Sequence, residues 1–240
     1  MSMDQQSEPS VHRRLLRTIT VWDLPTRIFK WSLVVAVSLA FLFSSGRPHG
    51  SLFLIHVACG YAVTLLLLFR FAWGFIGGRY ARFRSFVYGW RGIRAYALGL
   101  LRLDPPKTVG HNPVGGLMIM TMLATLCVIV VTGLLAESRT GGAGRLSGLL
   151  SPGSVVILGD IHAWLGFFII WLAGLHVAGV LFESLLHREN LVRSMITGRK
   201  KTADPSDRDG QVSLWRAAPL LVLLAILGAW LTVGTHLPPR

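Results

Sequence analysis

The chain has 240 residues, of which 52% are hydrophobic and only 15% are charged. This balance excludes an intrinsically disordered chain and gives too few charges for a water-soluble surface, and two cysteines exclude a disulfide scaffold. The formal net charge of +13 would indicate nucleic-acid binding in a soluble chain, so the placement of the basic residues has to be considered first.

Apolar stretches long enough to cross about 30 Å of hydrocarbon, as helices of about 20 residues, recur along the chain. They cover residues 24–45, 52–76, 114–136, 161–186 and 217–235. The sequence therefore predicts an all-α membrane protein. The last stretch has no polar residue at its centre that would indicate a function.

Most of the 24 Lys+Arg residues lie before the first span, between the second and third, and before the fifth. By the positive-inside rule, we expect a cytoplasmic N-terminus and an external C-terminus. The basic excess then reports topology, and no nucleic-acid partner is expected. Residues 1–20 carry no apolar core region, so we expect no cleavable signal peptide.

The segments between the spans are polar or amphipathic. Apolar and basic residues alternate at helical spacing over about residues 82–103, which predicts an amphipathic helix on the cytoplasmic surface. Attraction to anionic lipid headgroups is its simpler role, and partner binding is the alternative. Residues 138–154 resemble an external loop, and residues 202–216 a charged cytoplasmic linker.

Three histidines lie inside apolar spans, where an ionisable side chain is functional by default. They are His56, His162 and His176. The last two share one predicted helix and one face of it, about 21 Å apart along the axis. That separation is too great for one metal ion, but it suits two ligands that each hold a large planar cofactor such as haem.

His56 and His162 are predicted to lie at the same depth and can sandwich one iron. Each is followed four residues later by a glycine, Gly60 and Gly166, on the same helix face. A porphyrin lying against a helix needs such a missing side chain. The alternative is a hydrogen-bonded histidine pair beside packing glycines.

Any haem here is of the b type, because no Cys-x-x-Cys-His motif is present to form thioether links. By depth, a partner for His176 should come from the cytoplasmic start of the first span, where the residue is Lys30. His111, before the third span, could reach a haem propionate or a quinone oxygen, or cap the span.

Several spaced motifs together resemble the bacterial cytochrome b561 family, which includes the b-type cytochrome subunits of nickel-iron hydrogenases. The resemblance runs from about residue 20 to 201. It rests on VWDLPTRIFKW at 21–31, His56-x-x-x-Gly60, GHNPxGG at 110–116, His162 with His176, and RENLVRxMITGRK at 188–200.

The resemblance implies a four-helix transmembrane bundle with two haems in a bacterial inner membrane. Such a cytochrome carries electrons between the quinone pool and a redox partner, either a soluble c-type cytochrome or an oxidoreductase subunit such as hydrogenase. The expected organisation is a cytoplasmic tail at 1–20, the haem domain at 21–201, a linker at 202–216 and a fifth transmembrane helix at 217–236, with the C-terminus periplasmic.

The family motif reads Arg-x-x-His-Trp, but this chain has Arg27-x-x-Lys30-Trp31. Three arrangements stay open: Lys30 and His176 both ligate an inner haem, His176 alone ligates it while Lys30 pairs a propionate, or no inner haem binds. A lysine amine binds iron only when neutral. Arg27, on the same face as Lys30, is expected to pair a propionate or to extend to the headgroups.

Nothing in the sequence resembles a catalytic acid–base pair or an activated nucleophile, so no catalytic residue is predicted and enzymatic activity stays open. Two other functions compete with electron carriage. One is a superoxide- or small-reductant:quinone oxidoreductase of the same fold, and the other is a haem-free transporter or assembly scaffold.

Overall fold

The computed structural model describes residues 17–45, 50–136 and 150–233, and most of them are helical. Four helices in this part of the chain are long and apolar enough to cross a membrane. They are α1 (Leu24–Leu42), α2 (Ser51–Ile76), α4 (Pro113–Ala136) and α5 (Pro152–Leu186). The four spans predicted between residues 24 and 186 are confirmed as helices.

The last of these helices, α5, begins earlier than predicted. The Ser151 hydroxyl accepts a hydrogen bond from the Ser154 N–H at 3.3 Å, and Pro152 occupies the first turn. A serine followed by proline is a helix start, so the prediction of a loop as far as residue 154 was wrong at its end. The rest of that predicted loop, up to residue 149, lies outside the described residues. At 1.5 Å per residue, the 35 residues of α5 rise about 52 Å.

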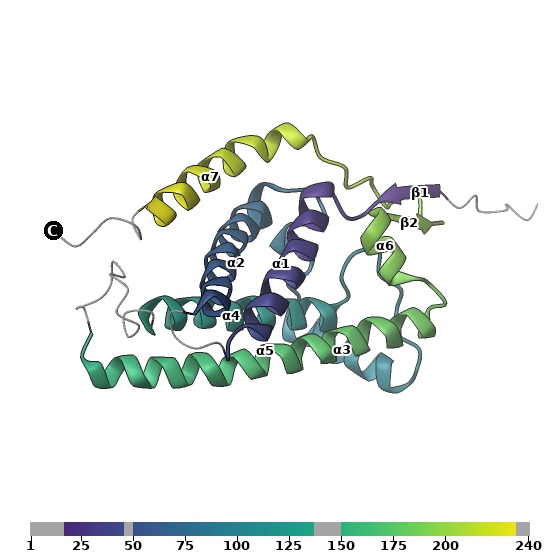
Figure 1. Ribbon diagram of the computed structural model, residues 1–240. Helices are drawn as coiled ribbons and strands as arrows, with labels where there is room; N and C mark the ends of the chain where they lie inside the picture. The colour runs from purple at the N-terminus through teal and green to yellow at the C-terminus, as the bar shows by residue number, and fades with distance from the viewer. Residues whose placement is uncertain (1–16, 46–49, 137–149, 234–240) are drawn as a thin grey trace, which may run out of the picture.

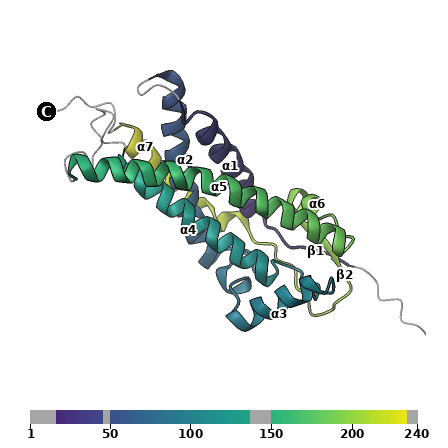
Figure 2. The ribbon, with the colours of Figure 1, turned by 90° about the horizontal axis from the view of Figure 1, so that it is seen from below.

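The four long helices form two pairs, α1 with α2 and α4 with α5. Figure 1 shows the second pair beneath the first, and from below α4 and α5 lie in front of α2 and α7 (Figure 2). The pairs meet where α2 packs on α4. Buried apolar side chains from all four helices form the core, including Phe29, Leu67, Leu123, Leu126, Ile169 and Leu172.

One end of the bundle, called here the basic end, carries the short elements. They are η1 (Phe83–Ser85), α3 (Trp90–Leu101), α6 (Leu191–Thr197) and the strands β1 (Arg17–Thr20) and β2 (Arg199–Thr202). The strands pair antiparallel, with Arg17 opposite Thr202 and Thr20 opposite Arg199. This sheet was not predicted, and it joins the end of the predicted tail to the end of the predicted haem domain.

The predicted amphipathic helix at 82–103 is shorter than expected, because the chain turns inward before α3 begins. Phe86 is buried, and its carbonyl oxygen would lie 2.1 Å from a Cβ built on Gly116 of α4. Only a glycine permits so close an approach. Gly89 then caps α3, so the helical part starts at Trp90.

The predicted fifth helix is present as α7 (Ala218–Val233), which follows η3 (Leu214–Arg216) and packs on α2. Its 16 described residues rise about 24 Å, less than the about 30 Å of a hydrocarbon core. Residues 234–240 lie outside the described part of the chain. The helix is confirmed, and its passage across the membrane stays a prediction.

Candidate functional site

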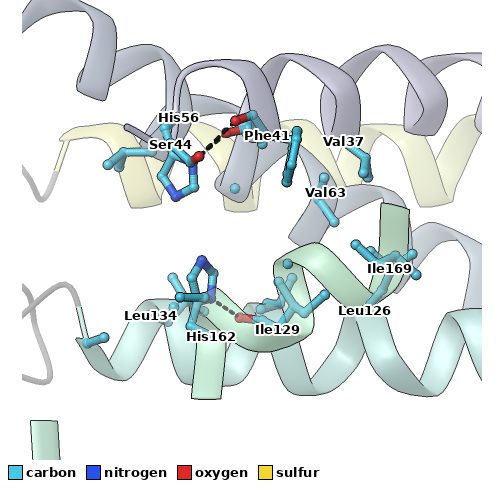
Figure 3. A pocket seen from close by; sticks show the side chains of 18 of the residues that line it. Val37, Phe41, Ser44, His56, Val63, Leu126, Ile129, Leu134, His162 and Ile169 are labelled. Atoms are coloured by element: carbon cyan, nitrogen blue, oxygen red, sulfur yellow. Dashed lines mark hydrogen bonds between the residues drawn. The ribbon is translucent and has the colours of Figure 1, made fainter. Parts of the chain in front are cut away.

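Two imidazole rings face each other at the end of the bundle opposite the basic end. His56 lies in the second turn of α2, and His162 lies in α5. Their ring centroids are 5.8 Å apart and the ring planes are nearly perpendicular, at 84°. Figure 3 shows the two rings pointing toward each other from opposite walls of a pocket. The structure thus brings together the two histidines that were predicted to share a depth.

Each of these rings is held by a backbone carbonyl group. The Nδ1 of His56 bonds to the Ala40 oxygen at 2.7 Å, and the Nδ1 of His162 bonds to the Ile129 oxygen at 2.8 Å. A carbonyl oxygen can only accept, so each Nδ1 carries a proton, and in a neutral ring the Nε2 lone pair is then left for a metal ion. An Nδ1–H bonded to a carbonyl is the arrangement that orients metal-ligating histidines.

The space beside the rings is apolar and kept clear by glycines. The pocket has a volume of about 450 Å³, within the about 300–1,000 Å³ typical of cofactor sites. Gly60 and Gly166 both line it, and a Cβ added to either would meet nothing within 4 Å. The His-x-x-x-Gly spacing therefore leaves open space one turn from each ring, which a planar cofactor would need.

A third glycine in the pocket was missed by sequence reasoning. A Cβ added to Gly133 of α4 would lie 2.7 Å from Cε1 and 2.9 Å from Nδ1 of His162. The ring of His162 can occupy its place only because this side chain is absent. The signal was available, since Gly133 lies near the same end of its span as the two histidines.

The other predicted site residues do not line this pocket. His176 lies on the same helix α5, about four turns further toward the basic end than His162, and Lys30 of α1 is close enough to interact with it electrostatically. Lys30 Nζ lies 5.6 Å from the ring centroid of Trp31, and among the described residues no carboxylate pairs with it. Arg27 donates from Nη1 to the Ile196 oxygen of α6 at 2.6 Å, while its buried Nε has no hydrogen-bond partner in the described structure.

A buried arginine near the basic end was also missed. Arg70 of α2 donates to the Ala81 oxygen at 3.0 Å, and its guanidinium lies 4.9 Å from the ring centroid of Phe83 and 5.4 Å from that of Phe86. Asp23, the N-cap of α1, contributes an opposite charge that acts on it. Aromatic faces and one carboxylate thus accommodate a charge that burial would otherwise penalise.

His111 lies beside this arginine and does not cap α4. The cap is Asn112, whose side-chain oxygen accepts from the Gly115 N–H at 2.6 Å. The His111 ring packs 4.5 Å from Trp22 and 5.0 Å from Phe86, between centroids, and its buried Nδ1 has no hydrogen-bond partner within the described ranges. Burial, and then the positive charge of nearby Arg70, lowers the pKa of His111 to about 3.

Glu183 organises the basic end. This carboxylate of α5 accepts from the Tyr96 hydroxyl of α3 at 2.7 Å and from the side-chain amide of Asn112. His187 Nε2 lies 3.8 Å from the same carboxylate. Burial, followed by the hydrogen bond to Glu183, raises the pKa of Tyr96. The sequence signal was a single acidic residue two helical turns after His176 in an apolar span.

The pocket geometry points to coordination chemistry. Two imidazoles whose Nδ1 atoms are bonded to carbonyl groups face one another, and no acid–base pair or nucleophile lies among the residues that line the space. Such a donor set would suit an iron porphyrin held by one nitrogen of each histidine. The residues present therefore fit a haem.

Comparison with known families gives a match over most of the chain. A family model described as prokaryotic cytochrome b561 matches residues 21–198. That range contains His56, His162 and His176 together with the four long helices. No solved structure matches the chain.

Curated relatives resemble the chain along most of their own length. A protein of Rhizobium leguminosarum bv. viciae is 26% identical over an alignment of 244 positions. The alignment covers 86% of this chain and 98% of the relative. One of Azotobacter vinelandii is 28% identical, covering 78% and 90%, and one of Escherichia coli (strain K12) is 25% identical, covering 74% and 88%. The first two are named "Probable Ni/Fe-hydrogenase B-type cytochrome subunit", and the third carries the same name for hydrogenase 1.

Proposed function

We propose that this chain, which belongs to the prokaryotic cytochrome b561 family, holds haem b between His56 and His162 and carries single electrons in a membrane. The observation that supports this most directly is the pair of imidazoles with oriented Nδ1 atoms and free Nε2 atoms across an apolar pocket. Haem b supplies an iron that alternates between the ferrous and ferric states.

The protein side of this function is positioning and exclusion of water. The carbonyl groups of Ala40 and Ile129 fix the two rings, and Gly60 and Gly166 leave the space that a porphyrin plane needs. Apolar walls keep the site dry, which sets the reduction potential together with the axial ligands. No residue of this site has to transfer a proton for an electron to pass.

A reduced spectrum and a haem count test the proposal. The purified chain, reduced with dithionite, should show an α-band near ~560 nm, the usual b-type position. His56→Ala and His162→Ala should each remove one haem per chain in a pyridine haemochrome count, whereas His187→Ala at the basic end should not. A colourless protein would overturn the proposal and leave the haem-free scaffold.

Glycine variants separate haem binding from folding. Gly60→Ala and Gly166→Ala add a methyl group where the protein has room, so the folded chain should be as stable as before. With a porphyrin in that room, both should lower haem occupancy. Gly174→Ala, which is also in open space on α5 but outside the pocket, is the matched control. Equal haem content in all three would contradict the placement.

We further propose that a second haem would be held by His176 and the Lys30 amine, with Arg27 available to pair a propionate. The support is a lysine inside an apolar helix, close to His176 and without a carboxylate partner in the described structure. The unpartnered Nε of Arg27 leaves one donor available there. A count of two haems per chain, and a midpoint potential moved by Lys30→His, would support this. One haem per chain, or an unchanged titration, would refute it.

For the redox partner, we propose an oxidoreductase subunit of the hydrogenase kind on one side and the membrane quinone pool on the other. The support is the name shared by the relatives. A short-chain quinol should reduce the haem of the purified chain, and a hydrogenase should co-purify with it from native membranes. A soluble c-type cytochrome that exchanges electrons instead would replace the hydrogenase in this account.

A further inference from the structure

We propose that the groove between the end of α5 and α6 binds one anionic diacyl phospholipid, of the phosphatidylglycerol class. The groove lies at the basic end, away from the haem pocket, and has a volume of about 580 Å³. Its walls combine apolar side chains with two arginines, Arg188 and Arg193. This inference does not depend on the cofactor.

The apolar part of the groove is exposed and comes from both helices. Leu185 of α5 is 79% exposed and Ile196 of α6 is 58% exposed, and Leu181 and Val192 line the same walls. All four of these side chains are exposed in the described structure. Surfaces of this kind at a helix end are suited to acyl chains, because contact with hydrocarbon removes them from water.

The charge of the groove is positive and uncompensated. Its one carboxylate, Glu189, already pairs with Lys107 at 3.6 Å and with Lys200 at 3.9 Å. The side chains of Arg188 and Arg193 form no ion pair with any described residue. Two free guanidinium groups in one groove match the forked oxygen geometry of a phosphate group.

The groove is also held in shape. The Leu191 N–H donates to the Ser184 hydroxyl at 3.3 Å, and the Glu189 N–H donates to the Ser184 carbonyl at 3.0 Å, so the turn between the helices is tied to α5. Arg188 occupies this turn with a left-handed φ of 53°, which is unusual for a residue with a side chain. The backbone of the turn that carries Arg188 is therefore fixed relative to α5.

The depth of the groove fits a lipid that enters from the side. Asn112 at the start of α4 bonds to Glu183 of α5, which marks the level where the apolar part of α4 begins. Leu181 lies just inside that level, while Arg188 and Arg193 follow beyond it. Acyl chains would therefore lie along Leu181 and Leu185 with the phosphate at the arginines, where basic side chains between helices bind anionic headgroups.

Native mass spectrometry of the purified chain in detergent tests this. Wild type should retain dioleoylphosphatidylglycerol more tightly than dioleoylphosphatidylcholine, which has the same chains. The double variant Arg188→Gln, Arg193→Gln should weaken the first phosphatidylglycerol association by about 25-fold, from about 5-fold for each arginine. Its binding of phosphatidylcholine should change less than about twofold, since the apolar walls remain.

Controls separate the groove from general attraction. Arg91→Gln, Arg94→Gln removes two exposed charges from α3 at the same end and should leave the tightest lipid unaffected. The double variant Arg188→Lys, Arg193→Lys keeps the positive charges without the planar fork and should give an intermediate loss of affinity. It also tests the proposal if the glutamine variant fails to fold. Soluble glycerol phosphate should not displace the lipid.

Three results would overturn the proposal. One is an equal weakening of phosphatidylglycerol binding in the α3 variant, which would mean that the lipid is attracted only by general surface charge. The second is equal retention of the two lipids by wild type. The third is displacement by glycerol phosphate, which would assign the arginines to a soluble phosphate instead of a lipid.

Discussion

At the residue scale, the orientation of His162 depends on a side chain that is missing. Gly133→Ala would place a Cβ within 3 Å of two atoms of the ring, so the imidazole or the α4 backbone has to move. Outer partners that orient a ligating histidine are worth about 10–100-fold in metal affinity. We therefore expect a loss of that order in haem affinity for this variant.

The measurement is haem content per chain after purification, followed by titration of added haemin. Alanine is a better helix former than glycine by about 1 kcal/mol, so a weaker α4 cannot explain a loss of haem. Gly174→Ala serves again as the control. Normal haem affinity in Gly133→Ala would show that the ring of His162 does not need its present orientation.

His111 gives a prediction for pH. Its pKa is about 3 in the folded chain and about 6.5 when unfolded, so below pH 6.5 the unfolded state binds a proton that the folded state does not. Stability is therefore lost as the pH falls from 6.5, by at most about 1.4 kcal/mol per pH unit. The charged groups that act on it are Arg70 of α2, Lys30 of α1, His176 of α5 and Lys200 of β2.

Thermal unfolding of the detergent-solubilised chain at pH 7.5 and 5.0 measures this effect. His111→Gln has no titrating ring, so its loss of stability between the two pH values should be smaller than that of wild type by about 2 kcal/mol. The same loss in both proteins would mean that other groups carry the pH dependence.

At the scale of elements, Glu183 joins α3, the start of α4 and the end of α5. Glu183→Ala would leave the Tyr96 hydroxyl and the Asn112 amide without their acceptor, at a cost of about 1–3 kcal/mol for each group that stays buried. Glu183→Gln keeps one acceptor oxygen and should cost less. We expect the melting temperature to fall in the order wild type, glutamine variant, alanine variant.

Limited trypsin digestion localises this effect. If Glu183 holds α3 in place, the alanine variant should be cut faster at Arg94 and Arg102, and the exposed Arg216 should be cut at the wild-type rate. Cleavage that accelerates equally at all three sites would indicate general unfolding instead of release of α3.

The helices were predictable from sequence because their apolar runs are long and uninterrupted, and the pairing of His56 with His162 followed from their depth. The sheet was not, because Arg17 and Thr202 meet across almost the whole chain and no local pattern links them. The orienting carbonyls of Ala40 and Ile129 were also beyond reach, since every residue has a backbone oxygen. Only the folded geometry selects which one a ring meets.

At the scale of the whole molecule, the basic residues predict a cytoplasmic N-terminus and an external C-terminus. The side of the membrane on which the C-terminus lies depends on whether α7 crosses it, and the described part of α7 is shorter than a full span. A C-terminal alkaline phosphatase fusion should be active and a C-terminal green fluorescent protein fusion dark. The same fusions after residue 210, before α7, should behave in the opposite way. A fluorescent full-length fusion would place α7 on the membrane surface.

His162 and His176 stand on one unbroken helix, α5. Inserting a single residue between them would swing one imidazole by about 100° relative to the other, while a step of seven residues returns it to within about 20° and adds about 10 Å. The distance between the two imidazole rings along α5 can therefore be lengthened or shortened only in steps of whole helical repeats. Repacking of side chains cannot change it continuously.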